Sequence, residues 1–219
     1  MTIATEAEAR ALVARLGDPG SVERCEHLLD LLAEENTRQN LVSKASLADA
    51  WVRHIADSAQ LLTYVPRETP GPWLDLGTGA GFPGLVVAAL RPDLPVCMVE
   101  SRTRRVDWLE RAKQKLSLSQ ARVLGCQLEA VESFPTAAIS ARAFAPLQRL
   151  IEISARFSTS DTIWLLPKGR SAWDEVNQLS GWHHLFHVEQ SLTDPDAGVV
   201  VGSLAGPLGG LAKARRKSR

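Results

Sequence analysis

Cysteine is scarce in this sequence, and long apolar runs are absent. The three cysteines, Cys25, Cys97 and Cys126, are widely spaced and form no C-x-x-C pair. Neither a disulfide framework nor a zinc knuckle is therefore indicated. No apolar run approaches the roughly 20 residues of a membrane span, and the N-terminus lacks the pattern of a signal peptide. We therefore expect a cytoplasmic protein with no membrane contact.

Two catalytic signatures are also missing. The only tyrosine, Tyr64, is followed by Glu68 at the position where a Tyr-x-x-x-Lys pair of the oxidoreductase type requires lysine. His183 and His187 are four residues apart, but they lack the acid of an H-E-x-x-H zinc motif. We therefore expect no metal site.

Charge is balanced over the whole chain but is unevenly distributed. The 25 basic residues match the 25 acidic ones, yet residues 213–219 hold five basic and no acidic residues. Residues 101–122 hold seven basic residues against two acidic ones. A basic helix and a basic tail on an acidic body indicate an anionic partner that touches a restricted part of the surface. A merely solvated tail is the simpler alternative.

The first part of the chain shows helical periodicity only. We expect one helix capped by Ser21 and another opened by Ser46, with Asp49 completing a capping box and a polar loop over 36–43 between the two helices. The Thr69–Pro72 stretch marks a boundary. The predicted division is a helical cap over 1–70, a ligand-binding domain over 71–212 and a basic tail over 213–219.

After this boundary, apolar strand patterns alternate with helical ones. Strands are predicted at 73–75, 96–100, 122–125, 137–141 and 162–166, helices at 85–90, 106–116, 147–157 and 173–179, and a closing hairpin at 185–188 with 199–201. This alternation is typical of an α/β protein with a doubly wound, Rossmann-like parallel sheet. Ligands of such sheets bind outside the carboxyl ends of the strands.

The stretch from Trp73 to Gly84 joins the first of these strands to a helix through three glycines at alternate positions. Its G-x-G-x-x-G pattern alone fits a dinucleotide site. Asp75 distinguishes the two cofactor classes, because a carboxylate beside the turn would repel a pyrophosphate and attract the ammonium and sulfonium of S-adenosylmethionine. The pattern D-x-G-x-G-x-G, which includes Gly77 and Gly79, therefore favours S-adenosylmethionine.

Further candidates lie where strands end. Glu100 ends the second strand and could accept hydrogen bonds from ribose hydroxyls. Arg142 follows the fourth strand and Lys168 the fifth, so both should reach the rim of the glycine turn and suit a phosphate-bearing substrate. His54 and Asp57 share a helix face by their spacing, for which a surface pair is the simpler interpretation.

Taken together, these residues resemble the GidB/RsmG family of bacterial 16S rRNA methyltransferases. The similarity covers residues 21–205 and is carried by motifs at 40–43, 52–58, 75–84, 100–105, 140–147 and 168–169. The resemblance implies a class I S-adenosylmethionine-dependent methyltransferase fold with an N-terminal helical cap. It also implies methyl transfer to N7 of a guanine in a loop of 16S ribosomal RNA, either as free RNA or in the small ribosomal subunit. Separately, we expect a monomer.

The family's cofactor contacts, carried over position by position, fall on Gly77, Phe82, Leu128, Glu129 and Arg142. The sequence departs from the family pattern at Gln127, where arginine is common, at Trp108 and at Arg104. The last two substitutions keep the character of the residue, whereas Gln127 removes a charge near the expected adenine site.

The implied chemistry agrees with the lack of a catalytic base. Guanine N7 carries a free lone pair and no proton, so an in-line attack on the methyl group needs positioning and no general base. Arg142 and Lys168 would hold a phosphate or guanine O6, while His54 and Asp57 would belong to the cap. A methyltransferase of another substrate and a non-catalytic RNA-binding protein of the same fold remain as alternatives.

Overall fold

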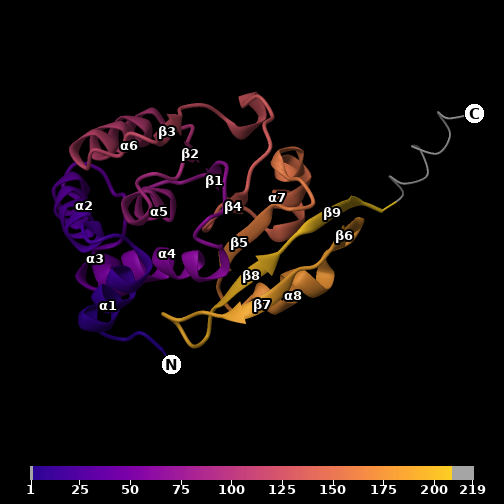
Figure 1. Ribbon diagram of the computed structural model, residues 1–219, viewed down its shortest axis with the longest axis horizontal. Coiled ribbons are helices and arrows are strands. Elements are labelled where there is room, and N and C mark those ends of the chain that lie inside the picture. The colour runs from indigo at the N-terminus through magenta and orange to yellow at the C-terminus, as the bar shows by residue number, and fades with distance from the viewer. Residues whose placement is uncertain (1, 209–219) are drawn as a thin grey trace, which may run out of the picture.

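The computed structural model describes residues 2–208, so the predicted tail at 213–219 lies outside the described residues. A seven-stranded sheet with the order β3-β2-β1-β4-β5-β8-β7 runs through the molecule (Figure 1). Its strands are β1 (Trp73–Leu76), β2 (Val96–Val99), β3 (Ala121–Leu124), β4 (Ala138–Ser140), β5 (Ile163–Lys168), β7 (His187–Gln190) and β8 (Gly198–Gly202). The first five strands are parallel, and β8 runs antiparallel to both of its neighbours.

The strand order reverses between β1 and β4, because the chain first builds outward to β3 and then returns to the other side of β1. Such a reversal opens a crevice at the carboxyl ends of the two central strands. The predicted doubly wound sheet and its closing hairpin, β7 with β8, are both confirmed. The short strands β6 (Trp182–His184) and β9 (Leu204–Pro207) pair separately.

Both faces of the sheet are apolar, as expected for parallel strands covered by helices. Along β1, Trp73 packs into the core on one face, whereas Leu74 and Leu76 pack into the core on the other. The first face is covered by α5 (Gly84–Leu90) and α6 (Thr103–Lys115), and the second by α7 (Leu147–Ser154) with the short helix η4 (Ala155–Phe157) and by α8 (Ala172–Gln178). Helix α6 begins three residues before its predicted start at 106.

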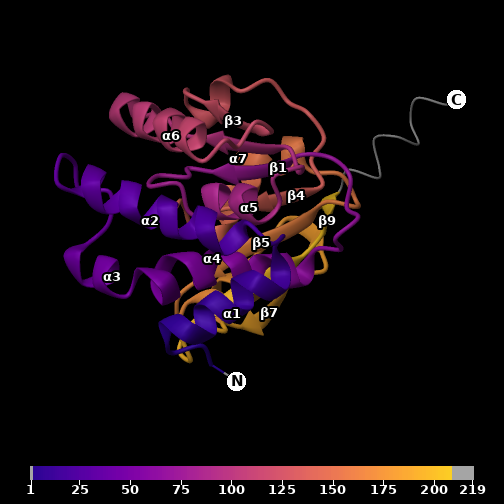
Figure 2. The same ribbon diagram turned by 60° about the vertical axis from the view of Figure 1, so that its left-hand side comes forward.

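The N-terminal segment is helical, as predicted. It contains α1 (Glu6–Leu16), α2 (Ser21–Asn36), α3 (Lys44–Ala48), the π-helix η1 (Trp51–Ala56), α4 (Asp57–Ala59) and η2 (Gln60–Tyr64). Figures 1 and 2 show these helices against α5, on the side of the sheet away from α7. Their apolar side chains join those of α5 and α6 in one continuous core.

Three local predictions in this segment are wrong. Ser21 is the first residue of α2 and is not its cap, because its hydroxyl accepts the N–H of Asp18 at 2.8 Å. Ser46 lies inside α3, which is capped instead by Ser43 through a 3.1 Å hydrogen bond from the N–H of Ser46. The turn over 51–56 is a π-helix and not the α-helix expected there.

Several polar contacts tie the N-terminal segment to the rest of the chain, among them an ion pair and a backbone hydrogen bond that lie outside the candidate site. Glu35 of α2 forms an ion pair with Arg111 of α6, with 2.9 Å between Oε1 and Nη2. The backbone N–H of Ile3 donates to the carbonyl of Leu192 at 2.6 Å. These contacts hold α2 against α6 and the start of the chain against the segment after β7, and the division into a cap over 1–70 and a ligand-binding domain stays a prediction. Within residues 2–208, no helix is both long and apolar enough to cross a bilayer.

Candidate active site

The turn after β1 leaves the sheet through backbone conformations that favour glycine. Gly77 has φ +62° and Gly79 φ +59°, in the left-handed region where residues with a Cβ are strained. The N–H of Thr78 donates to the carbonyl of Val99 at 3.0 Å, and the indole N–H of Trp108 donates to the carbonyl of Ala80 at 2.9 Å. Trp108 thereby fixes the turn against α6.

Asp75 lies beneath this turn and is fully buried. Its Oδ1 accepts the hydroxyl of Ser140 at 2.7 Å, and its Oδ2 accepts the N–H of Gly84 at 3.0 Å. Ser140 in turn accepts the indole N–H of Trp73 at 2.8 Å. Burial raises the pKa of Asp75 to about 6, against the opposing effect of these hydrogen bonds. Asp75 therefore braces β1, β4 and α5, and its direct contact with a cofactor ammonium stays a prediction.

Glu100 stands at the carboxyl end of β2 with its carboxylate already oriented. Its Oε1 accepts the N–H groups of Ser101 and Arg102 at 2.8 and 2.9 Å, whereas Oε2 lies 3.7 Å from Nη1 of Arg105. Oε2 thus keeps capacity for further hydrogen bonds, as two ribose hydroxyls would require. The adjacent Gly77 has no side chain, which leaves its backbone open to close contact, and the ring of Phe144 packs against it. These residues fit S-adenosylmethionine.

The predicted adenine-end residues follow β3. Leu128 is buried and Glu129 is exposed in the short helix η3 (Leu128–Ala130). Arg156 holds this segment by donating to the carbonyls of Leu128 and Val131. Gln127 is exposed, so the charge lost at this position would have been a surface charge.

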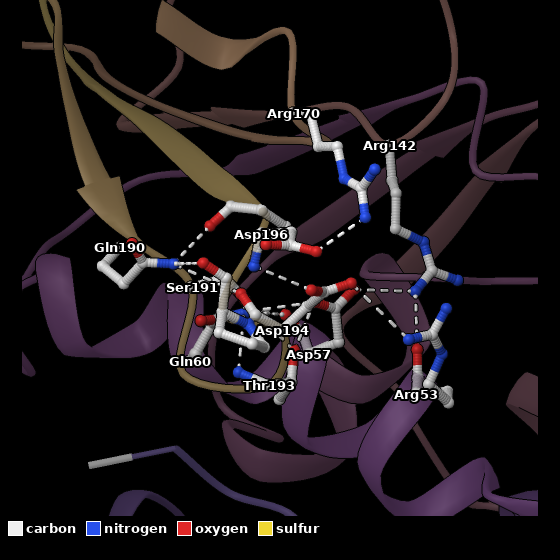
Figure 3. Close-up of polar contacts among 12 residues, drawn as sticks. Arg53, Asp57, Gln60, Arg142, Arg170, Gln190, Ser191, Thr193, Asp194 and Asp196 are labelled. Carbon is white, nitrogen blue, oxygen red and sulfur yellow. Dashed lines mark hydrogen bonds and ion pairs between the residues drawn. The ribbon is translucent and has the colours of Figure 1, made fainter.

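Arg142 lies at the centre of a group of polar contacts (Figure 3). It follows β4 and donates from Nη1 to Oδ2 of Asp57 at 3.0 Å and to the carbonyl of Arg53 at 3.2 Å, while Nη2 lies 3.4 Å from Nδ1 of His54. The guanidinium also lies over the ring of Phe82, 5.3 Å from its centroid. The structure therefore brings Arg142, His54 and Asp57 together, and the expectation of a simple surface His–Asp pair is wrong.

His54 is buried and stacks on Phe82, with ring centroids 4.9 Å apart. Burial, together with the charges of Arg142 and Arg53, lowers the pKa of His54 to about 4. The ring is therefore neutral at physiological pH. It packs η1 against Phe82 and does not act as a cation.

This depressed pKa predicts an acid-sensitive fold. Between about pH 4 and 6.5 the unfolded chain binds the His54 proton more readily than the native protein, so stability is complete above pH 6.5 and falls as the pH decreases. We expect His54 to account for a loss of about 1–2 kcal/mol between pH 8 and pH 5. Urea unfolding of the wild type and of His54→Phe at both pH values measures it. An equal loss in both proteins would show that His54 does not carry the effect.

Asp57 is held from the side opposite Arg142. Its Oδ1 accepts the amide of Gln60 and the hydroxyl of Thr193, both at 3.0 Å, as Figure 3 shows. Thr193 belongs to the turn between β7 and β8, where Asp194 also lies 3.7 Å from Arg53. No signal in the sequence connects these residues to Asp57, because their proximity arises only from the closing hairpin.

Lys168, the last residue of β5, is nearly buried and fully engaged. Its ammonium donates to the carbonyl of Ala145 and to the carboxylate of Glu175, both at 2.8 Å. Burial by itself would raise the pKa of the Glu175 carboxyl. The hydrogen bonds that this carboxylate accepts from Lys168, Ser171 and the N–H of Leu147 outweigh burial, so the pKa of Glu175 is lowered. Lys168 therefore holds the segment after β4 in place, and its contact with a substrate phosphate stays a prediction.

A cavity of about 620 Å³ opens beside the glycine turn. Four of the predicted residues line it, namely His54, Asp57, Arg142 and Lys168. Asp75, Gly77, Gly79 and Glu100 do not line it and lie along the neighbouring strand ends. Phe144 connects the two regions, because it lines the cavity and also packs against Gly77. Phe144 falls within the family motif at 140–147, but no signal in the sequence assigns it a role of its own.

Sequence comparisons agree with this arrangement. The model of the GidB family, rRNA small subunit methyltransferase G, matches residues 21–193. The chain is 58% identical over 209 residues to the ribosomal RNA small subunit methyltransferase G of Novosphingobium aromaticivorans, covering 93% of this chain and 90% of the relative. It is 57% identical to the protein of that name from Erythrobacter litoralis, covering 91% and 97%.

Solved structures of low sequence identity share the fold of this chain. A SAM-dependent methyltransferase from Aquifex aeolicus superposes with a TM-score of 0.55 at 14% identity, over 68% of this chain and 90% of the other. TYW2 of M. jannaschii in complex with AdoMet gives a TM-score of 0.56 at 10% identity, over 78% and 80%. The predicted class I methyltransferase fold is thereby confirmed. The resemblance to the GidB/RsmG family is confirmed as well, and the chain belongs to the rRNA small subunit methyltransferase G family.

Proposed function

We propose that this protein transfers a methyl group from S-adenosylmethionine to N7 of a guanine in a loop of 16S ribosomal RNA. The observation that carries the proposal is the position of Arg142, between the S-adenosylmethionine-type turn of β1 and a cavity of about 620 Å³. That volume lies within the usual range of ligand sites. Family membership makes the protein a methyltransferase that uses S-adenosylmethionine.

The residues of the cofactor region supply binding and orientation. When bound, S-adenosylmethionine supplies a methyl group activated by a positively charged sulfur. Gly77 would let the donor approach its backbone beside the ring of Phe144, Asp75 braces the turn from below, and Glu100 would offer Oε2 to the ribose. Leu128 and Glu129 follow β3 at the expected adenine end.

The acceptor side needs no proton acceptor, because guanine N7 carries none to remove. His54 is neutral and Arg142 is positively charged, so neither is suited to act as a base. We assign to Arg142 the orientation of the donor or the base through its guanidinium, and to Asp57 the fixing of Arg142. Lys168 would contribute by holding the carbonyl of Ala145 at the wall of the cavity.

The RNA surface would extend along α6, the residues just before it and β3. Arg102, Arg104, Lys115 and Arg122 are exposed and form no ion pair with any other residue between 2 and 208. Free cations of this kind suit phosphates, which fix register without reading the sequence. The basic residues at 213–219 would add to this surface. We propose that a cytoplasmic monomer, with residues 1–70 as its cap, acts on the small-subunit RNA.

Calorimetry and methyl transfer test this function together. We expect binding of S-adenosylmethionine but not of NAD, and transfer of its methyl group to one guanine N7 in small-subunit RNA. RNA made with 7-deazaguanosine, which carries carbon in place of N7, is the matched control and should accept no methyl group. Cells that lack the protein should lose one 7-methylguanine from 16S RNA.

Each alternative predicts a different result. Binding of NAD without S-adenosylmethionine would refute the cofactor assignment. Binding of S-adenosylmethionine and RNA without transfer would indicate a non-catalytic RNA-binding protein. Transfer to deaza-substituted RNA, or to protein or a small molecule only, would place the acceptor elsewhere.

A further inference from the structure

Phe144 is an exposed aromatic residue at the boundary of the two halves of the site. Among residues 2–208, the large apolar side chains that are exposed are Phe144, Trp173, Leu185 and Leu208, and of these only Phe144 lines the 620 Å³ cavity. Its exposed fraction is 37%. An aromatic ring in this place offers a flat apolar face to a ligand in the cavity.

The ring also touches the methyl-donor side. A Cβ placed on Gly77 would lie 2.1 Å from Cδ2 of Phe144, so the ring packs directly on the backbone of the glycine turn. No other phenylalanine, tyrosine or tryptophan within the described part of the chain lines this cavity. His54 does line it, but its ring already stacks on Phe82.

The backbone around Phe144 is firmly positioned. Ala143, which precedes it, has φ +52°, a conformation that is strained for a residue with a Cβ and persists only where the surroundings impose it. Arg142 is anchored on one side by Asp57, and Ala145 is anchored on the other by Lys168. These anchors present the ring at the mouth of the cavity, and they give Lys168 and Glu175 a role in the site.

We propose that Phe144 is the platform on which the target guanine stacks, so that the base lies next to the methyl donor at Gly77. This inference rests on the proposed function and names the residue that holds the acceptor base. Enzymes that modify a base take it out of its stack and hold it against aromatic or apolar side chains. Base stacking on an aromatic ring is tolerant of sequence and does not depend on titration.

The positive charge that develops on the guanine during methyl transfer strengthens its attraction to the Phe144 ring. When the lone pair of guanine N7 forms the new N–C bond, the bond between the methyl carbon and sulfur breaks and its electron pair stays on sulfur. The positive charge thus moves from the sulfonium to the guanine, and no proton is released. The face of an aromatic ring attracts a cation, so Phe144 would stabilise the transition state more than the bound substrate, which raises kcat.

The test compares Phe144→Leu, Phe144→Trp and Phe144→Tyr in the full-length protein with small-subunit RNA. Trp173→Leu is the matched control, because Trp173 is 62% exposed on α8 and does not line the cavity. We expect Phe144→Leu to lower kcat by roughly ten- to a hundredfold, with little change in the KM for RNA, because phosphate contacts elsewhere carry most of the affinity. Phe144→Trp and Phe144→Tyr should stay within a few-fold of the wild type.

Binding of S-adenosylmethionine, measured by calorimetry, should be nearly equal in all variants. A wild-type rate in Phe144→Leu would overturn the stacking role while leaving the proposed function intact. A fall in kcat matched by lost cofactor affinity would assign the ring to the methyl donor instead, and a Phe144→Trp as slow as Phe144→Leu would also refute stacking. Wild-type protein that transfers no methyl group to RNA would refute the proposed function itself.

Discussion

Gly77→Val should give a folded protein that no longer binds S-adenosylmethionine. Gly77 has φ +62°, and holding a β-branched residue there costs about 1–3 kcal/mol. The new Cβ would also lie 2.1 Å from Cδ2 of Phe144, so the exposed ring must rotate away, which lets the fold survive. The valine methyl groups would then occupy the turn where the donor's methionine end is proposed to lie. We expect the Kd to rise at least about a hundredfold, equivalent to roughly 3 kcal/mol.

Calorimetry measures this loss, and thermal unfolding shows whether the variant is folded. Gly181→Val is the matched control, because Gly181 has φ +78° but no atom within 4 Å of an added Cβ. It reproduces the backbone strain without crowding and lies next to β6, away from the site. It should therefore lose some stability and keep full cofactor affinity. Unchanged affinity in Gly77→Val would place the methionine end elsewhere.

The sheet could be predicted because its signals are local. The strands β1 (73–76) and β2 (96–99) are short apolar runs between turn signals, and the glycine turn follows β1 directly. Residues that follow successive parallel strands must emerge on one rim, which is why Arg142 and Lys168 were expected near the turn. The structure confirms both positions at strand ends.

The wrong helix starts have a physical explanation. Ser43 and Ser46 both have the chemistry of an N-cap, and local sequence does not distinguish them. The difference comes from Asn36, which lies outside α3. Its Oδ1 accepts the N–H groups of Leu41 and Val42 and so fixes the loop that precedes Ser43. With this loop fixed, the helix begins after Ser43. The π-helix at 51–56 is equally invisible to a pattern that assumes α-helical spacing.

The side-chain network of the site depended on contacts far apart in the sequence. Thr193 reaches Asp57 across 136 residues, through a turn that comes near the cap only once β7 and β8 have joined the sheet. Phe144 was hidden for another reason, since an apolar residue in a loop resembles a core residue until its exposure is known. Sequence thus located the rim of the site, whereas tertiary packing determined which side chains pair there.

Arg142→Ala should reduce methyl transfer by about a hundredfold or more. The guanidinium joins Asp57, the carbonyl of Arg53 and the ring of His54 while lying over Phe82. A hydrogen bond to a charged group contributes about 1.5–3 kcal/mol, and alanine removes more than one such contact at the centre of the site. The fold should survive, because Asp57 keeps hydrogen bonds from Gln60 and Thr193. Single-turnover transfer to small-subunit RNA measures the rate, and calorimetry measures cofactor affinity.

Arg142→Lys separates positive charge from geometry. Lysine supplies one compact charge that can pair with Asp57, but it cannot reproduce the planar fork that also reaches the carbonyl of Arg53. We therefore expect Arg142→Lys to recover only part of the lost rate. Arg149→Ala, which removes a 60% exposed arginine paired with Glu152 on α7, is the matched control and should be fully active.

Full recovery by lysine would mean that positive charge alone suffices, and a wild-type rate in Arg142→Ala would remove Arg142 from the site. A loss confined to cofactor affinity would assign the guanidinium to the donor, whereas a loss of rate at full affinity would assign it to the acceptor base.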